Sequence, residues 1–274
     1  MDLSLTDGDL PRGAWDCHTH VFGSFEAYPL RRPGPGTPNP EAAIEALMAM
    51  HAELGIAHGC LVQPVEYGWD HSYLLHALAA AEGAYVGVAM ADPDLGRAAM
   101  ARLAAGGVGA LRFMFFDQAK LTPTRDALMG GVAAARDLGW RLRVLGSPAN
   151  HPELFAVLEA VEDVPILLEH MAMSGPGPVG EGLARMLAKP NVWLMLSSGH
   201  RRSREPPPWR DMAETCAALY ALAPRRCVWG SDWPYLGAGP RIDERDALAL
   251  LASYLPDEAA WRAVMAGNPA ALNA

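Results

Sequence analysis

Two histidines near the start of the chain have the type and spacing for chemistry, in the stretch GAWDCHTHVFG at residues 13–23. If this largely apolar stretch is a β-strand, successive side chains point to opposite faces of the sheet. His18 and His20 then share one face, and both imidazoles project into one space. Paired imidazoles can act as general acids and bases or bind a divalent metal, and they can equally be ordinary histidines of a core or surface. The side chains that other strands place nearby distinguish a chemical role of the two histidines from a structural one.

Three more ionisable side chains stand within or at the ends of apolar runs far along the chain. Arg112 lies within VGALRFM, His170 ends VPILLEH, and Asp232 ends RCVWGSD. Each also has a structural explanation. His170 could bond to backbone in the core, Asp232 could cap a helix in a Ser-Asp-Trp-Pro turn, and Arg112 could form a buried ion pair. A fold that brings the ends of these runs together would place all three beside the two histidines.

Eight short apolar runs predict the strands of such a fold. They span 14–21, 56–63, 84–90, 108–114, 140–146, 164–170, 191–197 and 226–232. Between and after them lie segments with apolar residues at three- and four-residue spacing, which is typical of amphipathic helices. The predicted helices span 40–54, 71–82, 94–105, 123–138, 152–162, 178–188, 208–222 and 243–253.

Strand and helix alternate throughout, which predicts an α/β fold with a parallel sheet inside a layer of helices. Eight repeats in a chain of 274 residues match a closed (β/α)8 barrel, or TIM barrel. We expect a leader at 1–13 and a single barrel domain at 14–274. A doubly wound open sheet is the alternative, but no GxGxxG motif follows the first strand. Two Pro-rich loops, 28–40 and 203–209, follow strands, where a barrel carries its active-site loops.

Composition limits the partners of the protein. Hydrophobic residues make up 51% and charged residues 19% of the chain, and the formal net charge is −9. This balance argues against nucleic acid and anionic membranes, so an anionic small-molecule substrate would need local arginines. The four cysteines form no CxxC pair and predict reduced thiols. With no signal-peptide pattern and no long apolar run, we expect a cytoplasmic protein, either a monomer or a small homo-oligomer.

Four motifs resemble the amidohydrolase superfamily, in its amidohydrolase family 2 branch. They are DCHTHVFG, LLEHMA, WGSDWP at 229–234 and MAGNPAALN at 265–273, in family order over nearly the whole chain. An HxH pair alone is a weak signal, whereas HxH on the first strand with GSDWP on the eighth is specific. Within the branch, DCHTHVFG and ALRFMFF (110–116) look most like the 2-pyrone-4,6-dicarboxylate hydrolase-like lactonases.

The resemblance implies a metal site in those members that use one, with His18, His20 and Asp232 as ligands. Such members add a histidine from the fifth strand and sometimes a lysine or glutamate from the fourth. This chain has no histidine in RLRVLGS and carries Arg112 on the fourth strand, whose charge would repel a cation. We therefore expect no cofactor. One divalent metal, zinc or manganese, is the alternative, since three protein ligands can suffice.

The resemblance also implies a lactonase, which cleaves the ring ester C–O bond of a carboxylated or sugar-acid lactone. Asp232 would activate water, and His18, His20 and His170 would polarise the carbonyl. Arg112 and Arg201 would bind a substrate carboxylate. The related lactonases have a basic residue and a tyrosine where this chain has Gln118 and Leu145, so we expect a lactone with one carboxylate or a sugar-acid lactone.

Some side chains near strand ends have open roles. Tyr28 and Trp233 could bind substrate, as could Trp69 and Tyr235, although aromatic residues there often only pack. Arg201 and its neighbours Arg202 and Arg204 could instead form a solvated loop. No role is assigned to the remaining histidines, His51, His58, His71, His76 and His151. The rival functions are a metal-dependent hydrolase or decarboxylase with one metal, and a catalytically silent barrel that binds a small acid.

Overall fold

Eight parallel strands form one sheet in chain order in the computed structural model, which describes residues 10–33, 42–92, 96–236 and 242–274. Each strand pairs with the next one along the chain, from the first to the eighth. The strands are β1 (Ala14–Thr19), β2 (Ile56–Val62), β3 (Tyr85–Met90), β4 (Val108–Met114), β5 (Arg141–Leu145), β6 (Ile166–Leu168), β7 (Val192–Met195) and β8 (Cys227–Val228).

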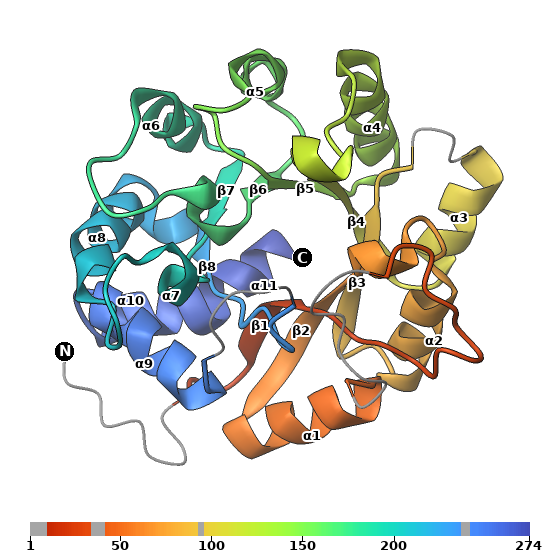
Figure 1. Ribbon diagram of the computed structural model, residues 1–274, viewed down its shortest axis with the longest axis horizontal. Helices are drawn as coiled ribbons and strands as arrows, with labels where there is room; N and C mark the ends of the chain where they lie inside the picture. Colours follow the sequence, from red (N-terminus) through yellow and green to blue (C-terminus); the bar gives the residue numbers. More distant parts are fainter. Residues whose placement is uncertain (1–9, 34–41, 93–95, 237–241) are drawn as a thin grey trace.

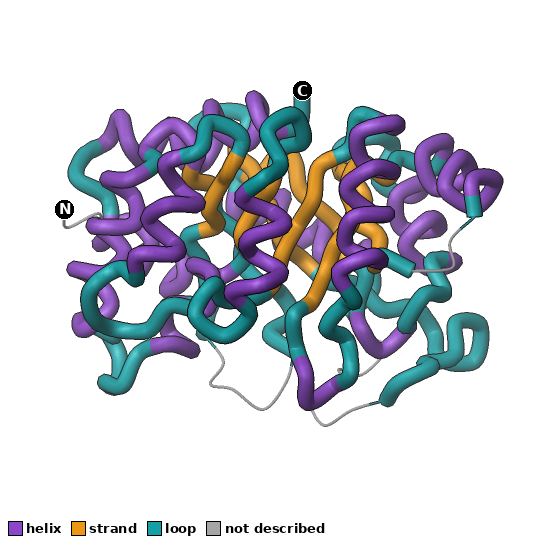
Figure 2. The backbone as a smooth tube through the Cα atoms, turned by 90° about the horizontal axis from the view of Figure 1, so that it is seen from above, coloured by secondary structure: helices purple, strands orange, loops and turns teal. Residues whose placement is uncertain are grey.

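Helices surround this sheet as a ring (Figure 1). They are α1 (Ile44–Leu54), α2 (Ser72–Ala80), α3 (Arg97–Ala105), α4 (Arg125–Leu138), α5 (Pro152–Glu159), α6 (Glu181–Ala188), α7 (Gly199–Arg202), α8 (Ala213–Leu222), α9 (Glu244–Tyr254), α10 (Glu258–Arg262) and α11 (Asn268–Leu272). In the view perpendicular to that of Figure 1, the strands run through the middle of the molecule with helices on both sides (Figure 2). The predicted alternation of strand and helix is confirmed.

The first and eighth strands close the sheet into a barrel. Beyond the two residues of β8, Trp229 accepts a backbone hydrogen bond from Cys17, and Asp232 donates one to His18, both at 2.9 Å. The buried carboxylate of Asp16 accepts from the backbone N–H of Ser231 at 2.9 Å. Gly230 permits this approach, since an added Cβ would lie 2.5 Å from the His18 Cβ. The (β/α)8 barrel is therefore confirmed, and the open-sheet alternative is wrong.

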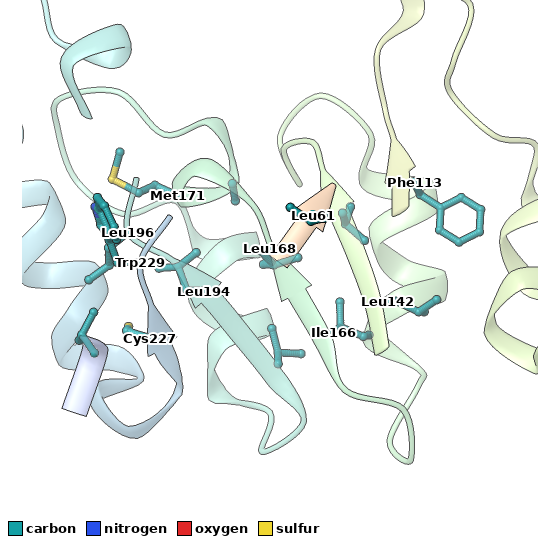
Figure 3. Packing of buried hydrophobic residues seen from close by; sticks show 14 of the residues in the cluster. Leu61, Phe113, Leu142, Ile166, Leu168, Met171, Leu194, Leu196, Cys227 and Trp229 are labelled. Carbon is teal, nitrogen blue, oxygen red and sulfur yellow. The ribbon is translucent and has the colours of Figure 1, made fainter. Parts of the chain in front are cut away.

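Alternation along the strands divides the buried side chains between two cores. Leu142, Ile166, Leu168 and Leu194 belong to the large core that the strands share with the helices (Figure 3). A smaller core holds the side chains of the opposite strand faces, which point into the barrel, among them Cys17, Cys60, Val88, Ala110 and Leu167. All four cysteines are free thiols, as predicted.

The last segment of the chain covers one end of the barrel, which was not predicted. Leu272 in α11 packs with the inner core, and the Arg141 guanidinium bonds to the carbonyls of Leu272 and Ala274 at 2.5 and 2.8 Å. Asn268 Nδ2 donates to the carbonyl of Cys227 at 2.7 Å. Asn268 of the MAGNPAALN motif thus ties the last segment of the chain to β8.

Six of the eight predicted strands end one to four residues earlier than expected. Among them, β6 stops at Leu168 and β8 at Val228, so His170 and Asp232 lie on turns beyond the strands. Both turns contain left-handed backbone, which a strand does not allow. The predicted leader falls mostly on residues 1–9, and the loop at 28–40 partly on 34–41, which lie outside the described residues. Among the described helices, none is long and apolar enough to cross a membrane.

Candidate active site

Three imidazoles surround one carboxylate at the carboxyl ends of the strands. Oδ1 of Asp232 lies 3.6 Å from Nε2 of His18, 3.6 Å from Nε2 of His20 and 3.8 Å from Nε2 of His170. All four residues are at most 8% exposed. The structure thus brings together the four side chains proposed for catalysis, from positions more than 200 residues apart in the chain.

Hydrogen bonds on the far side of each ring orient these imidazoles. Nδ1 of His20 lies 2.8 Å from the carbonyl oxygen of Val62, which only accepts, so Nδ1 carries the ring proton. Nδ1 of His170 lies 2.8 Å from Oγ of Ser197. The hydroxyl of Ser198 lies 3.1 Å from the same nitrogen and 3.4 Å from Oδ2 of Asp232. The ring of His20 is thus held by Val62 through Nδ1, and its Nε2 faces the carboxylate.

A fully buried carboxylate that sequence reasoning missed lies behind the histidines. Glu169 accepts from Nε of Arg112 on Oε2 and from Nε of Arg143 on Oε1, both at 2.9 Å. Arg143 also donates through Nη1 to the carbonyl of Cys17 at 2.8 Å, and its Nη2 lies 3.0 Å from Nδ1 of His18. A signal existed in the sequence: Arg141 and Arg143 share the inner face of β5, and a buried guanidinium requires a carboxylate.

The charges of this cluster shift the protonation of its members. Burial acts to raise the pKa of Asp232, but His170, His20 and His18 together hold it below its ordinary value. Glu169 is likewise held well below its usual pKa, against the effect of burial, by Arg112, His18 and Arg143. Burial lowers the pKa of His18 and of His170. At neutral pH the site therefore contains two carboxylates and neutral His18 and His170.

Strained backbone is concentrated in this cluster. Asp232 (φ 68°), Ser198 (φ 58°) and His170 (φ 49°) all adopt left-handed conformations, and the left-handed run continues through Met173. Such residues cost roughly 1–3 kcal/mol each and persist where the surrounding structure enforces them. Left-handed turns at the ends of β6 and β8 account for the position of His170 and Asp232 at the mouth of the barrel.

A cavity of about 310 Å³ opens above the histidines and Asp232. Three guanidinium side chains border it, from Arg112, Arg201 and Arg202. Its other described lining residues are His20, Val65, Glu66, Met114, Phe116, Leu145, His170, Met173, Ser198, Asp232 and Leu236. A larger cavity of about 740 Å³ shares Arg112 and Met114 but otherwise follows β4, α3 and α4, and the described residues lining it include no histidine.

The predicted substrate-binding residues separate into two groups. Arg112 borders the cavity and also forms the buried ion pair that was its alternative. Arg201 borders it while donating through Nη2 to the carbonyl of Leu236 at 2.7 Å. Tyr28 packs against the Tyr73 ring, with centroids 4.9 Å apart, and Trp233 pairs with Thr19 beside β1. Neither aromatic residue is among the described residues that line the cavity.

Other residues also have definite positions. Arg202, which could have belonged to a solvated loop, borders the cavity, whereas Arg204 is exposed. Leu145 lines the cavity, and Gln118 is exposed outside it. His51, which received no role, is buried and lies 2.7 Å from the Tyr85 hydroxyl.

The metal that the resemblance implies can be tested against this geometry. Nε2 of His18, Nε2 of His20 and Oδ1 of Asp232 lie 3.1–3.6 Å apart, a spacing that one zinc ion could bridge. Ligation through Nε2 places the ring proton on Nδ1, where it is donated to an acceptor. Nδ1 of His18 instead faces the donor-only guanidinium of Arg143. The contact with Arg143 therefore does not favour ligation of a divalent metal by Nε2 of His18.

Known proteins resemble this chain over nearly its whole length. A family model described as amidohydrolase matches residues 15–272. The chain is 30% identical to a 4-sulfomuconolactone hydrolase of Rhizobium radiobacter, covering 96% of this chain and 90% of the relative. It is 28% identical to the 2-pyrone-4,6-dicarboxylate hydrolase of Comamonas testosteroni, covering 90% and 84%. The apo crystal structure of ATU3138 from Agrobacterium tumefaciens has a TM-score of 0.84 at 25% identity and covers 96% of both chains.

Fold and site together define a barrel protein with three imidazoles and one carboxylate at the carboxyl ends of β1, β6 and β8. This is the architecture expected of the amidohydrolase superfamily. The chain belongs to the amidohydrolase family, since the family model covers it from residue 15 to residue 272. The resemblance drawn from the four sequence motifs is thereby confirmed.

Proposed function

We propose that this protein is a metal-independent lactonase that hydrolyses the ring ester of a small lactone bearing acidic groups. The observation that carries the proposal is the Asp232 carboxylate, 3.6–3.8 Å from three imidazole Nε2 atoms beside a cavity bordered by three arginines. Two relatives are a 4-sulfomuconolactone hydrolase and a 2-pyrone-4,6-dicarboxylate hydrolase, which supports the same reaction class.

Asp232 is the proposed general base. Its low pKa keeps it ionised at neutral pH, and one water can donate to its Oδ1 and to the lone pair on Nε2 of His20, two acceptors 3.6 Å apart. The water oxygen attacks the lactone carbonyl carbon while Asp232 takes the water proton. His20 thus orients water in this proposal. From the sequence, His20 was expected to polarise the carbonyl instead.

Negative charge then develops on the carbonyl oxygen and must be stabilised. On substrate binding, the N–H on Nε2 of His18 would pass from Nε2 of His20 to that oxygen, which frees the His20 lone pair for the water. An N–H of His170, whose Nε2 also faces Asp232, would donate to the same oxygen. Collapse of the tetrahedral intermediate breaks the ring C–O bond, and Asp232 returns its proton to the leaving oxygen. The product is an open-chain acid carrying a hydroxyl group or its keto tautomer.

The cavity favours a substrate with two acidic groups. Arg112 has Nε on Glu169, which leaves its terminal nitrogens to form a bidentate pair with one carboxylate. Nε of Arg201 and Nε of Arg202 are buried and have no hydrogen-bond partner among the described residues, so a second anionic group would satisfy this side of the cavity. The single carboxylate expected from the sequence followed from Gln118 and Leu145, which stand where the related lactonases have a basic residue and a tyrosine, and it did not take Arg202 into account.

A panel of lactones tests the proposal, with the wild type compared to Asp232→Asn. Removal of the base should lower turnover by about 100-fold to 10,000-fold. Asp163→Asn makes the same chemical change on the surface and should leave turnover unchanged. Cleavage of esters or amides but of no lactone would refute the substrate class.

The two rival functions predict different results in the same assay. The spacing of 3.1–3.6 Å between the possible ligand atoms is the observation that favours a metal-dependent hydrolase or decarboxylase. Such an enzyme would show turnover or CO₂ release only with added zinc or manganese. A catalytically silent barrel would bind small acids and turn over no member of the panel, with or without Asp232.

A further inference from the structure

Arg143 makes contacts of one kind only, because a guanidinium donates hydrogen bonds and accepts none. Its Nε donates to Glu169 and its Nη1 to the carbonyl of Cys17, at 2.9 and 2.8 Å. The third contact is from Nη2 to Nδ1 of His18, at 3.0 Å. Arg143 is 2% exposed and is held from two sides, so it cannot turn away from the imidazole. Nδ1 of His18 must therefore accept, and its ring proton lies elsewhere.

One competing acceptor could reverse this assignment. Oε1 of Glu169 lies 3.4 Å from Nδ1 of His18, and a proton on Nδ1 could be donated to it. That distance exceeds the usual range of about 2.7–3.2 Å for an N–H···O bond. The same oxygen already accepts from Nε of Arg143 at 2.9 Å. A proton on Nδ1 would also point at the N–H of Nη2 of Arg143. The shorter contact with the guanidinium therefore places the ring proton of His18 on Nε2.

The other end of the ring completes a consistent chain of donors and acceptors. Nε2 of His18 lies 3.1 Å from Nε2 of His20. The proton of His20 is on Nδ1, where it is donated to the carbonyl of Val62, so Nε2 of His20 accepts. His18 supplies the matching N–H from Nε2. Each hydrogen bond from Arg143 through both rings to Val62 then has one donor and one acceptor.

We propose that Arg143 is a positioning residue that fixes His18 as its Nε2–H tautomer. The consequence is twofold. An N–H donor faces the reacting centre, and the lone pair that a divalent metal would need on Nε2 of His18 is occupied. The catalytic consequence rests on the proposed lactonase function, whereas the tautomer and the loss of the metal site can be measured without any substrate.

Nuclear magnetic resonance of the wild-type protein labelled with ¹⁵N in histidine tests the tautomer directly. Long-range ¹H–¹⁵N correlations distinguish a ring protonated on Nε2 from one protonated on Nδ1, and His18→Gln assigns the signal. We expect His18 to be protonated on Nε2 alone, and His20 on Nδ1 alone. Protonation of His18 on Nδ1 would overturn the proposal, whatever the protein hydrolyses.

Arg143→Met removes the donor while Arg112 still pairs with Glu169. The His18 proton can then move to Nδ1 and bond to Glu169, which frees Nε2. After incubation with zinc and removal of unbound ion, this variant should retain about one zinc per chain by elemental analysis, as a three-ligand site would. Wild type and Arg141→Met, altered two residues away on the same strand, should retain far less.

Activity gives a third readout. Arg143→Met without zinc should turn over a cleaved lactone about 100-fold more slowly, with KM changed far less, because the lost interaction acts in the transition state. Zinc retention by Arg143→Met that equals the wild-type value would overturn the metal-excluding half of the proposal. If Arg143→Met fails to fold, the wild-type spectrum still decides the tautomer.

Discussion

Substitution of Glu169 is the most demanding single test of the buried charge network that this residue forms with Arg112 and Arg143 behind the site. The perturbation is Glu169→Gln, which keeps the size of the side chain and removes its charge. Both carboxylate oxygens accept from guanidinium Nε atoms at 2.9 Å, and Glu169, Arg112 and Arg143 are each at most 4% exposed. An amide offers one acceptor oxygen, so its NH₂ group would face one of these N–H donors. Two buried cations would then share no neutralising carboxylate.

Removing one partner from a buried ion pair destabilises a protein by about 3–5 kcal/mol. For a chain of this size that corresponds to a fall in Tm of roughly 6–20 °C. Thermal and urea-induced unfolding followed by circular dichroism measure the change. The matched control is Asp163→Asn, which removes the same charge from the exposed ion pair with Arg136 and should leave both midpoints unchanged. Equal midpoints for Glu169→Gln and wild type would refute the account of this network.

Three further predictions concern closure, pH and the cavity. Gly230→Ala places a Cβ 2.5 Å from the His18 Cβ and 2.8 Å from the His18 backbone nitrogen, so we expect the free energy of unfolding to fall by about 1–3 kcal/mol. The control, Gly267→Ala, adds a Cβ that meets no described atom within 4 Å and should not destabilise the protein. Burial holds the folded-state pKa of His18 below 6.5, so the unfolded chain binds the proton first, and stability should fall by about 1.4 kcal/mol per pH unit as pH drops below about 6.5. In a thermal-melt series this slope should be smaller for His18→Gln, and an identical slope would contradict the assignment. Arg202→Gln should raise KM for a diacidic lactone by about 10-fold to 100-fold, and Arg204→Gln on the exposed loop should not; equal effects would remove Arg202 from the site.

The architecture was predictable because each strand carries its own signal. Apolar runs of seven or eight residues alternate with helical periodicity, and a closed barrel is the arrangement that eight such units favour. Closure then places β1 beside β8, so the convergence of His18, His20 and Asp232 follows from topology alone. The end of the chain was missed because α11 contains only five residues, and its role depends on contacts of Asn268 and Leu272 with distant strands.

The charge network could be predicted only in part, because partner choice is a long-range property. LLEH was noted for His170, while Glu169 beside it pairs with arginines 26 and 57 positions away. In the fifth strand, the sequence was examined only for a histidine, which is absent there. Arg143 of the same strand was not considered as a partner of His18. Likewise, the left-handed backbone falls on His170 and Asp232 themselves, which are not glycines, so the sequence gives no signal for it. Tertiary contacts impose these conformations.

Turnover of a diacidic lactone by protein dialysed against a chelator is the most direct measurement of the central claim. Elemental analysis of the same sample must accompany the assay, so that the metal content at each measured rate is known. The account predicts an undiminished rate when zinc and manganese are far below one equivalent, together with the collapse of that rate in Asp232→Asn. A rate lost on chelation and restored by zinc or manganese would contradict it.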